Sequence, residues 1–95
     1  MEIGQVVSSK AGRDKGRYFI IIAVDEVHSE YVYIADGDLR KIENLKKKKT
    51  KHLIPLTIDE KTKEKLLKGL KITNADLRKS LKCNYQHSQE VNFSI

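Results

Sequence analysis

Four cationic side chains and two glycines share one short stretch of the chain, and together they could bind phosphate groups. The stretch is residues 10–17, with the sequence KAGRDKGR. Lysine neutralises a phosphate as a point charge, and arginine can donate two parallel hydrogen bonds to its oxygens. Glycine lets another backbone come close. The candidate contacts of this segment, called the glycine loop below, are Lys10, Gly12, Arg13, Lys15, Gly16 and Arg17.

A second run of cations lies at residues 46–51, with the sequence KKKKTK. Five lysines so close together repel one another on a folded surface, whereas on nucleic acid they displace condensed counterions and make affinity steeply dependent on salt. The plainer alternative is a solvated linker. We expect a surface loop between two strands that contacts phosphate through Lys46, Lys47, Lys48, Lys49 and Lys51.

The positive charge of the chain is unevenly distributed. The 95 residues carry a net charge of +6. Residues 1–40 hold five cations against seven acids, whereas residues 41–83 hold fourteen against five. A basic protein favours an acidic partner, which could be nucleic acid, a membrane surface or an acidic protein. Because the cations are clustered, we expect nucleic acid.

Other chemistry is poorly represented in the sequence. Cys83 and His87 have the spacing of half a metal site, but nothing supplies the other half. No nucleophile stands beside a base, so we expect no enzyme activity, no metal and no cofactor. A single cysteine fits a reducing compartment. Without an apolar run of about 18 residues or a signal peptide, the sequence predicts a cytoplasmic protein that is not embedded in a membrane.

The elements that must position these residues are mainly short strands. The segment 18–24, YFIIIAV, is rich in β-branched and aromatic residues and is apolar on both faces, with Phe19 expected in the core. Asp36-Gly37 is a hairpin signal. Five short strands with tight turns predict a mostly β fold, a small SH3-like barrel. The expected strands are residues 3–9, 18–24, 31–34, 39–45 and 53–54.

Two short helices are expected after the strands. Thr57 and Glu60 have the spacing of a capping box, and Gly69 can end the helix that they begin. Thr73 or Asn74 caps a second helix that runs to about Lys82. The predicted organisation is therefore a barrel at residues 1–55, a helical C-terminal appendage at 56–83 and a mobile tail at 84–95.

The first part of the chain resembles the KOW motif of ribosomal proteins and transcription elongation factors. The residues that carry this resemblance are Gly4, Val6, Val7, Gly12, Gly16 and the strand at 19–24. The chain is also similar to a narrower group, the large-subunit ribosomal proteins numbered fourteen in the eukaryotic naming and their short bacterial relatives. That similarity covers about residues 2–82 and includes Asp36-Gly37 with Arg40, the lysine run, and residues 72–81, ITNADLRKSL.

The resemblance implies a KOW-type SH3-like barrel that binds structured RNA, above all ribosomal RNA of the large subunit, and catalyses nothing. It implies that Arg40 joins the lysines of residues 46–51 in a second RNA-binding patch. Ribosomal proteins are further expected partners. The ribosomal members continue into long helical extensions, whereas two short helices and a tail follow here. Stable residence in a ribosome and a looser accessory association therefore both stay open.

A second hypothesis belongs to another class, a protein-interaction module of the transcription or translation machinery. In that case Tyr31, Tyr33 and the acidic turns would form the contact, and the lysines would be incidental. The two tyrosines could equally stack on RNA bases or pack within the fold. The oligomeric state stays open, although exposed edge strands would permit a dimer.

Overall fold

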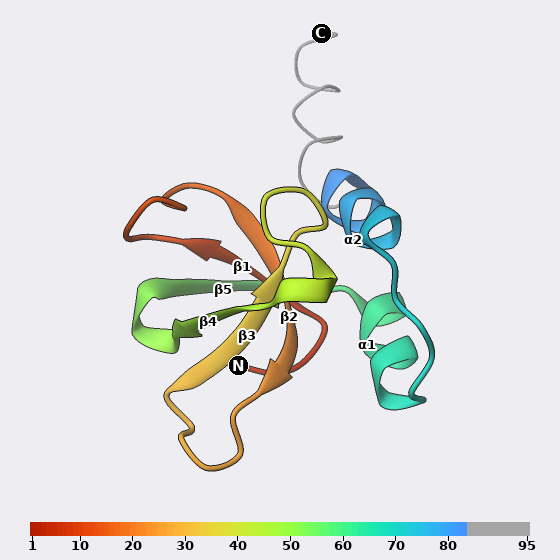
Figure 1. The fold of residues 1–95 in the computed structure, drawn as a ribbon, viewed down its shortest axis with the longest axis horizontal. Helices are drawn as coiled ribbons and strands as arrows, with labels where there is room; N and C mark the ends of the chain where they lie inside the picture. Colours follow the sequence, from red (N-terminus) through yellow and green to blue (C-terminus); the bar gives the residue numbers. More distant parts are fainter. Residues whose placement is uncertain (84–95) are drawn as a thin grey trace, which may run out of the picture.

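Five antiparallel strands form a single sheet in the computed structural model, which describes residues 1–83 (Figure 1). Their order across the sheet is β4-β3-β2-β1-β5. The mostly β character expected from the sequence is confirmed. The strands are β1 (Gln5–Ser9), β2 (Tyr18–Val24), β3 (Tyr31–Ala35), β4 (Lys46–Lys49) and β5 (Leu53–Ile58).

The first half of β2 is buried on both faces of the sheet, which explains its continuous apolar run. Along β2, Phe19 and Ile21 point to one face and Ile20 to the other. The inner cluster, which contains residues of the strands only, comprises Val7, Phe19, Ile21, Val32, Ile34 and Leu53. The helix-facing cluster comprises Val6, Ile20, Ala35, Ile72, Leu77 and Leu81. Phe19 is fully buried, as expected.

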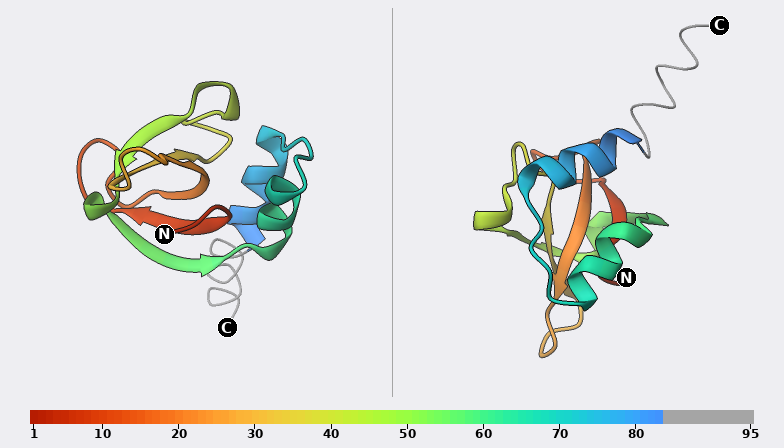
Figure 2. Two further views of the ribbon diagram at one scale, coloured as in Figure 1. Left: turned by 90° about the horizontal axis from the view of Figure 1, so that it is seen from below. Right: turned by 90° about the vertical axis from the view of Figure 1, so that its right-hand side faces the viewer.

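The sheet curls strongly, but no strand pairing joins its two edges within residues 1–83 (Figure 2). β4 pairs only with β3, and β5 pairs only with β1. A short 3-10 helix, η2 (Thr50–His52), carries the chain from one edge strand to the other. The structure therefore establishes a curled five-stranded antiparallel sheet.

Three segments differ from the sequence prediction, and all lie after β3: residues 39–45, the lysine run and the strand expected at 53–54, which continues to Ile58. Residues 39–45 are not a strand, because Asp36 forms a tight turn in which one carboxylate oxygen accepts hydrogen bonds from the N–H groups of Asp38 and Arg40. A second 3-10 helix, η1 (Ile42–Asn44), follows this turn. The lysine run was expected as a loop, and that expectation was wrong: Lys46–Lys49 form β4, aligned with β3 from Ile34 to Tyr31.

Two helices lie on one side of the sheet, α1 (Glu60–Leu67) and α2 (Asn74–Leu81) (Figures 1 and 2). The cap predicted at Thr57 was wrong, because β5 pairs with β1 as far as Ile58 and the N-cap is Asp59. Of the two residues predicted to cap the second helix, Thr73 is the N-cap and Asn74 is the first residue of α2. The Thr73 hydroxyl accepts from the Asp76 N–H, and its own N–H lowers the pKa of the Asp76 carboxyl. The tail expected at 84–95 lies outside the described residues.

The helix α2 is seated on the turn that follows β3. Gly37 has φ +79°, and a Cβ added there would come within 2.2 Å of the Asn74 carbonyl oxygen. The Arg78 guanidinium donates a hydrogen bond to the Gly37 carbonyl, and the Asn74 side chain accepts from the Ile42 N–H. The turn and the first residues of α2 are therefore packed backbone against backbone.

Gly37→Ala is expected to destabilise the protein by about 3 kcal/mol, since it combines overpacking with a left-handed backbone that alanine disfavours. Urea unfolding measures this loss. Gly69→Ala is the matched control, because Gly69 has φ +71° but faces open space, and it should cost only about 1 kcal/mol. Equal losses for the two variants would show that the contact with α2 does not matter.

Candidate nucleic-acid interface

The glycine loop joins β1 to β2 and is held in a defined shape by its own backbone. The Gly16 N–H donates to the Ser9 carbonyl at 2.8 Å, and the Arg17 N–H donates to the Asp14 carbonyl at 2.9 Å. Gly12 and Gly16 have φ +77° and +85°, which a side chain would strain. The glycines that the sequence marks for close approach are thus the residues that let the loop turn back on itself.

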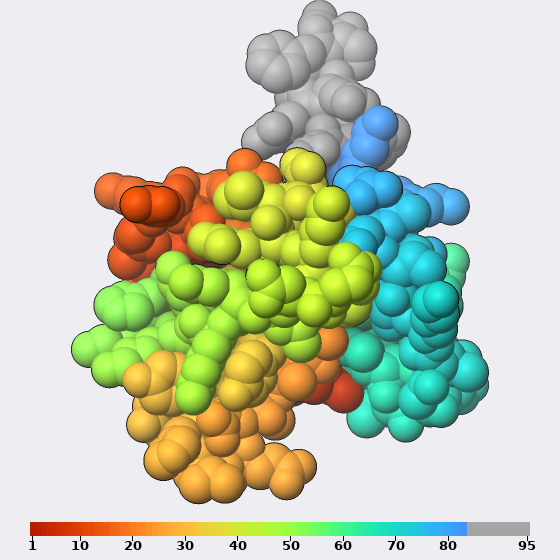
Figure 3. Space-filling model, in the orientation of Figure 1, coloured from red at the N-terminus to blue at the C-terminus, as the bar shows by residue number. Residues whose placement is uncertain are grey.

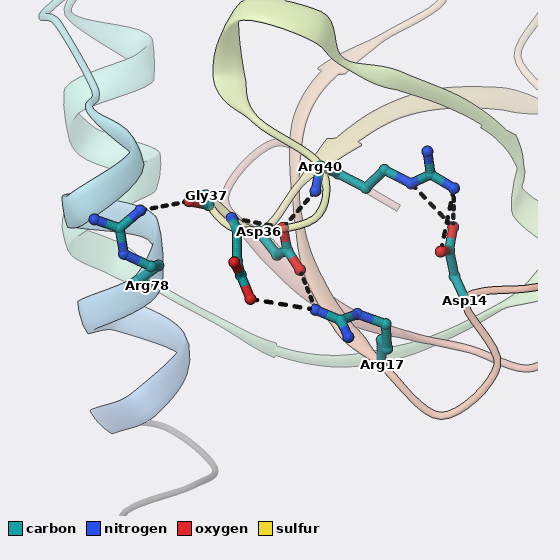
Figure 4. A network of polar contacts seen from close by, with 7 residues as sticks. Asp14, Arg17, Asp36, Gly37, Arg40 and Arg78 are labelled. Atoms are coloured by element: carbon teal, nitrogen blue, oxygen red, sulfur yellow. Dashed lines mark hydrogen bonds and ion pairs between the residues drawn. The ribbon is translucent and has the colours of Figure 1, made fainter.

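A buried carboxylate inside this loop was missed by sequence reasoning. The Asp14 side chain is only 2% exposed, and the Arg40 guanidinium donates to it from Nε at 3.3 Å and from Nη2 at 3.1 Å (Figure 4). A paired fork of this kind is among the stronger hydrogen-bonded contacts. The contact fastens the glycine loop to the turn after β3. The sequence did offer one signal, a single acid among the four cations of the loop. It did not indicate that Arg40 is the partner of this acid.

Arg17 is also paired within the protein. Its Nη2 lies 3.2 Å from the buried carboxylate of Asp36 and 3.6 Å from the exposed carboxylate of Asp38 (Figure 4). Asp36 is itself held by the turn that it organises, so Arg17 gives the loop a second attachment to the same place. Arg17 and Arg40 were both expected to contact phosphate. Some of their hydrogen-bond donors are instead used within the protein, where they hold the loop in shape.

The remaining cations of the loop point into solvent. Lys10, Arg13 and Lys15 are exposed, and within the described chain none of them forms an ion pair. These are the loop side chains that can neutralise an external anion without first giving up an internal partner.

The lysine run divides between the two faces of β4. Lys47 and Lys49 align with Tyr33 and Tyr31, whereas Lys46 and Lys48 align with the buried Ile34 and Val32. On a pleated strand, aligned residues share a face. Lysines on an edge strand also discourage pairing with another chain. The run is therefore two pairs of cations that point in opposite directions, followed by the exposed Lys51.

The two cation clusters meet in space although they are far apart in the sequence. The Lys48 ammonium donates to the Ala11 carbonyl at 3.4 Å, and the Lys10 N–H donates to the His52 carbonyl at 3.0 Å. In Figure 3 the orange-red atoms of the glycine loop adjoin the green atoms of the lysine run, with the turn after β3 beside them in yellow. The glycine loop, Lys48 and η2 thus form one continuous part of the surface.

Two acids near this surface moderate its charge. Asp25 accepts backbone hydrogen bonds from His28 and Val27 and lies 3.7 Å from Lys47, and these contacts, that of His28 first, lower the pKa of its carboxyl. Asp38, in the turn after β3, pairs with Arg17. Lys47 is therefore partly neutralised, whereas Lys51 forms no ion pair in the part of the chain that the structure describes.

An open groove of about 620 Å³ lies beside Arg17, between the glycine loop, the turn after β3 and α2. Its lining includes Arg78 and Lys82 but also Asp36 and Asp38. Because these charges have both signs, the groove does not extend the cationic surface as a uniform anion site.

No protein-family model matches the chain, and no curated protein is significantly similar to it. Among residues 1–83, no helix is long and apolar enough to cross a membrane. The same residues contain no cluster of three His, Cys, Asp or Glu side chains that could hold a metal ion.

Proposed function

We propose that the protein binds structured RNA through its phosphate backbone and catalyses no reaction. One observation carries the proposal: the fold brings the loop with the exposed Lys10, Arg13 and Lys15 against Lys48 of β4 and against η2, which carries Lys51. The ion pairs of Asp14 and Asp36 hold the loop in shape. Cations on a preformed surface bind phosphate without first being ordered.

The proposal favours recognition of shape over recognition of sequence. Base-specific contacts come from polar side chains that reach base edges, above all Arg or Lys on guanine and Asn or Gln on adenine. The surface offers chiefly lysines, which contact phosphates as point charges. We take the RNA to be ribosomal RNA of the large subunit and the curled sheet to be a variant of the SH3-like barrel, because the residues at 4–24 and 36–53 resemble the KOW proteins.

Sucrose-gradient sedimentation of the tagged protein in native lysate tests the proposal. Migration with the large ribosomal subunit at low salt, lost as salt is raised, is the expected result. With about five phosphates neutralised, the logarithm of affinity for purified RNA should fall with the logarithm of salt at a slope of roughly −4. Protein that stays at the top of the gradient at all salt concentrations, and does not bind purified ribosomal RNA, would contradict the proposal.

A protein-interaction role is the second candidate, and one observation favours it. The connection between β2 and β3 presents Val27 at 83% exposure beside the exposed acids Glu26 and Glu30. An exposed apolar side chain ringed by charge is a common feature of protein contacts. Nuclease treatment separates the two functions, because a complex held by RNA dissolves and a complex held by protein contacts survives.

Asp25→Asn is expected to strengthen RNA binding about threefold at low salt, because it releases Lys47 from a partly exposed ion pair. Asparagine keeps the oxygen that accepts the hydrogen bonds of Val27 and His28, so the turn should persist. Fluorescence anisotropy with a labelled RNA measures the change. Glu26→Gln is the matched control, since it removes the same charge without touching Lys47. An equal gain in the control would assign the effect to net charge alone.

A further inference from the structure

We propose that Tyr31 and Tyr33 stack unpaired bases of the RNA next to the phosphate-binding surface. The lysines aligned with them on β4 would bind the phosphates of the same nucleotides. The RNA recognised would then contain unpaired nucleotides, such as a bulge or an open loop, beside a helical segment. This inference rests on the proposed function and adds the structural class of the RNA.

The two tyrosines occupy a part of the sheet that the fold does not use for its core. Alternation along β3 sends Val32 and Ile34 into the inner cluster and Tyr31 and Tyr33 to the opposite face. On that face Ala35 belongs to the helix-facing cluster, but neither tyrosine packs with that cluster, and both rings stay partly exposed. The helices therefore cover one end of this face and leave the tyrosine end accessible.

Lysines of the neighbouring strand surround the Tyr31 ring. The Lys47 ammonium lies 4.6 Å from the ring centroid and the Lys49 ammonium lies 5.7 Å from it. These contacts fix the ring in a defined place and keep two cations beside it. When a base stacks on the ring, the same lysines can turn to its phosphates, so the arrangement supplies both interactions that single-stranded RNA sites use.

The spacing of the two tyrosines suits successive nucleotides. Residues two apart on a strand are separated by roughly 6.6 Å, which sets the rings side by side as neighbouring platforms. The glycine loop lies across the edge of the sheet from the tyrosines, because Lys48, on the other face of the edge strand β4, contacts Ala11. One RNA can thus place paired phosphates on the glycine loop and unpaired bases on the tyrosines.

A cross-strand Tyr–Lys pair can also serve only to stabilise an edge strand. In that case removing the rings would lower stability and leave the choice of RNA unchanged. The charge beside the Tyr31 ring favours nucleic acid, since two lysines border the ring and Asp25, the acid that contacts Lys47, is also engaged by backbone N–H groups.

The test compares two RNA hairpins of equal length, one fully paired and one with a two-nucleotide bulge, bound to the full chain at one salt concentration. The wild-type protein should bind the bulged hairpin about tenfold more tightly, the range expected from stacking. Tyr31→Ala with Tyr33→Ala should remove that preference and leave binding of the paired hairpin unchanged. Tyr31→Phe with Tyr33→Phe should keep the preference, because stacking needs the ring and not the hydroxyl.

A 2-aminopurine in the bulge reports stacking directly, through quenching of its fluorescence by the wild-type protein and the phenylalanine variant but not by the alanine variant. Equal affinity of the wild-type protein for both hairpins, or a preference that survives in the alanine variant, would overturn the inference and leave the proposed function standing. Failure of the wild-type protein to bind either hairpin at low salt would overturn both.

Discussion

Replacing Arg13 and Lys15 together by glutamate is expected to abolish RNA binding while the fold stays intact. Both side chains are exposed, and neither forms an ion pair within residues 1–83. Their loss therefore leaves no internal partner unsatisfied. The backbone hydrogen bonds of the loop and the buried pair of Asp14 are untouched by the change.

The expected loss of affinity is large because two contacts disappear and two repulsions replace them. A hydrogen bond to a charged group contributes about 1.5 kcal/mol or more, so the two lost contacts alone lower affinity roughly hundredfold. The salt dependence should also weaken, since the slope falls by about 0.7 to 0.9 for each phosphate contact removed. Anisotropy titrations of one labelled RNA over a range of salt concentrations measure both quantities.

Lys61→Glu with Lys71→Glu is the matched control for this variant. Both lysines are exposed and lie in α1 or just after it, on the opposite side of the molecule from the glycine loop (Figure 1). The two double variants change net charge equally, so a comparable loss in the control would mean that binding depends on overall charge and not on the loop. Circular dichroism and thermal unfolding show whether either variant alters the fold.

The local patterns of the chain predicted those parts of the fold that local interactions decide. The β-branched run at 18–24 formed β2 because it can be buried on both faces, and Thr73 capped α2 through contacts only three residues away. The alternation of residues 31–34 placed the tyrosines and the buried aliphatic residues on the correct faces. In each case the outcome depends on residues that are close in sequence or on a simple alternation of apolar and polar residues.

The failures came where distant partners decide the outcome. Four consecutive lysines have low strand propensity, yet the pairing of β4 with β3 makes them a strand. Thr57 has a capping-box partner in sequence, but the pairing of Ile58 with Gln5 keeps the chain extended for longer. The candidate site shows the same limit: composition identified its cations, whereas the partner of Asp14 lies 26 residues further on.

Arg40 gives the sharpest test of how the site is built. The resemblance of the chain to the KOW proteins leads us to expect that Arg40 contacts RNA. In the structure, however, the Arg40 guanidinium is bound to the buried Asp14. The two descriptions predict different effects of one substitution. If Arg40 chiefly positions the glycine loop, removing it should destabilise the protein and loosen the loop; if it chiefly contacts phosphate, removing it should weaken binding and spare the fold.

We expect Arg40→Ala to lower the free energy of unfolding by about 3 kcal/mol, because it leaves a buried carboxylate without a partner. Asp14→Ala with Arg40→Ala should recover part of that loss, since the stranded charge is gone as well. Urea unfolding of the single and double variants measures the coupling between the two side chains. A coupling near zero would show that the pair contributes nothing to the shape of the loop.

RNA binding by the same variant separates positioning from contact. Arg40→Ala should weaken binding through a less ordered loop, whose backbone amides should exchange hydrogen faster, but should leave the salt slope unchanged because no phosphate contact is lost. Lys15→Ala should do the reverse, with the slope reduced by about 0.7 to 0.9 and stability preserved. A reduced slope for Arg40→Ala, with normal stability, would make Arg40 a phosphate contact and would leave Asp14 as the residue that keeps it in place.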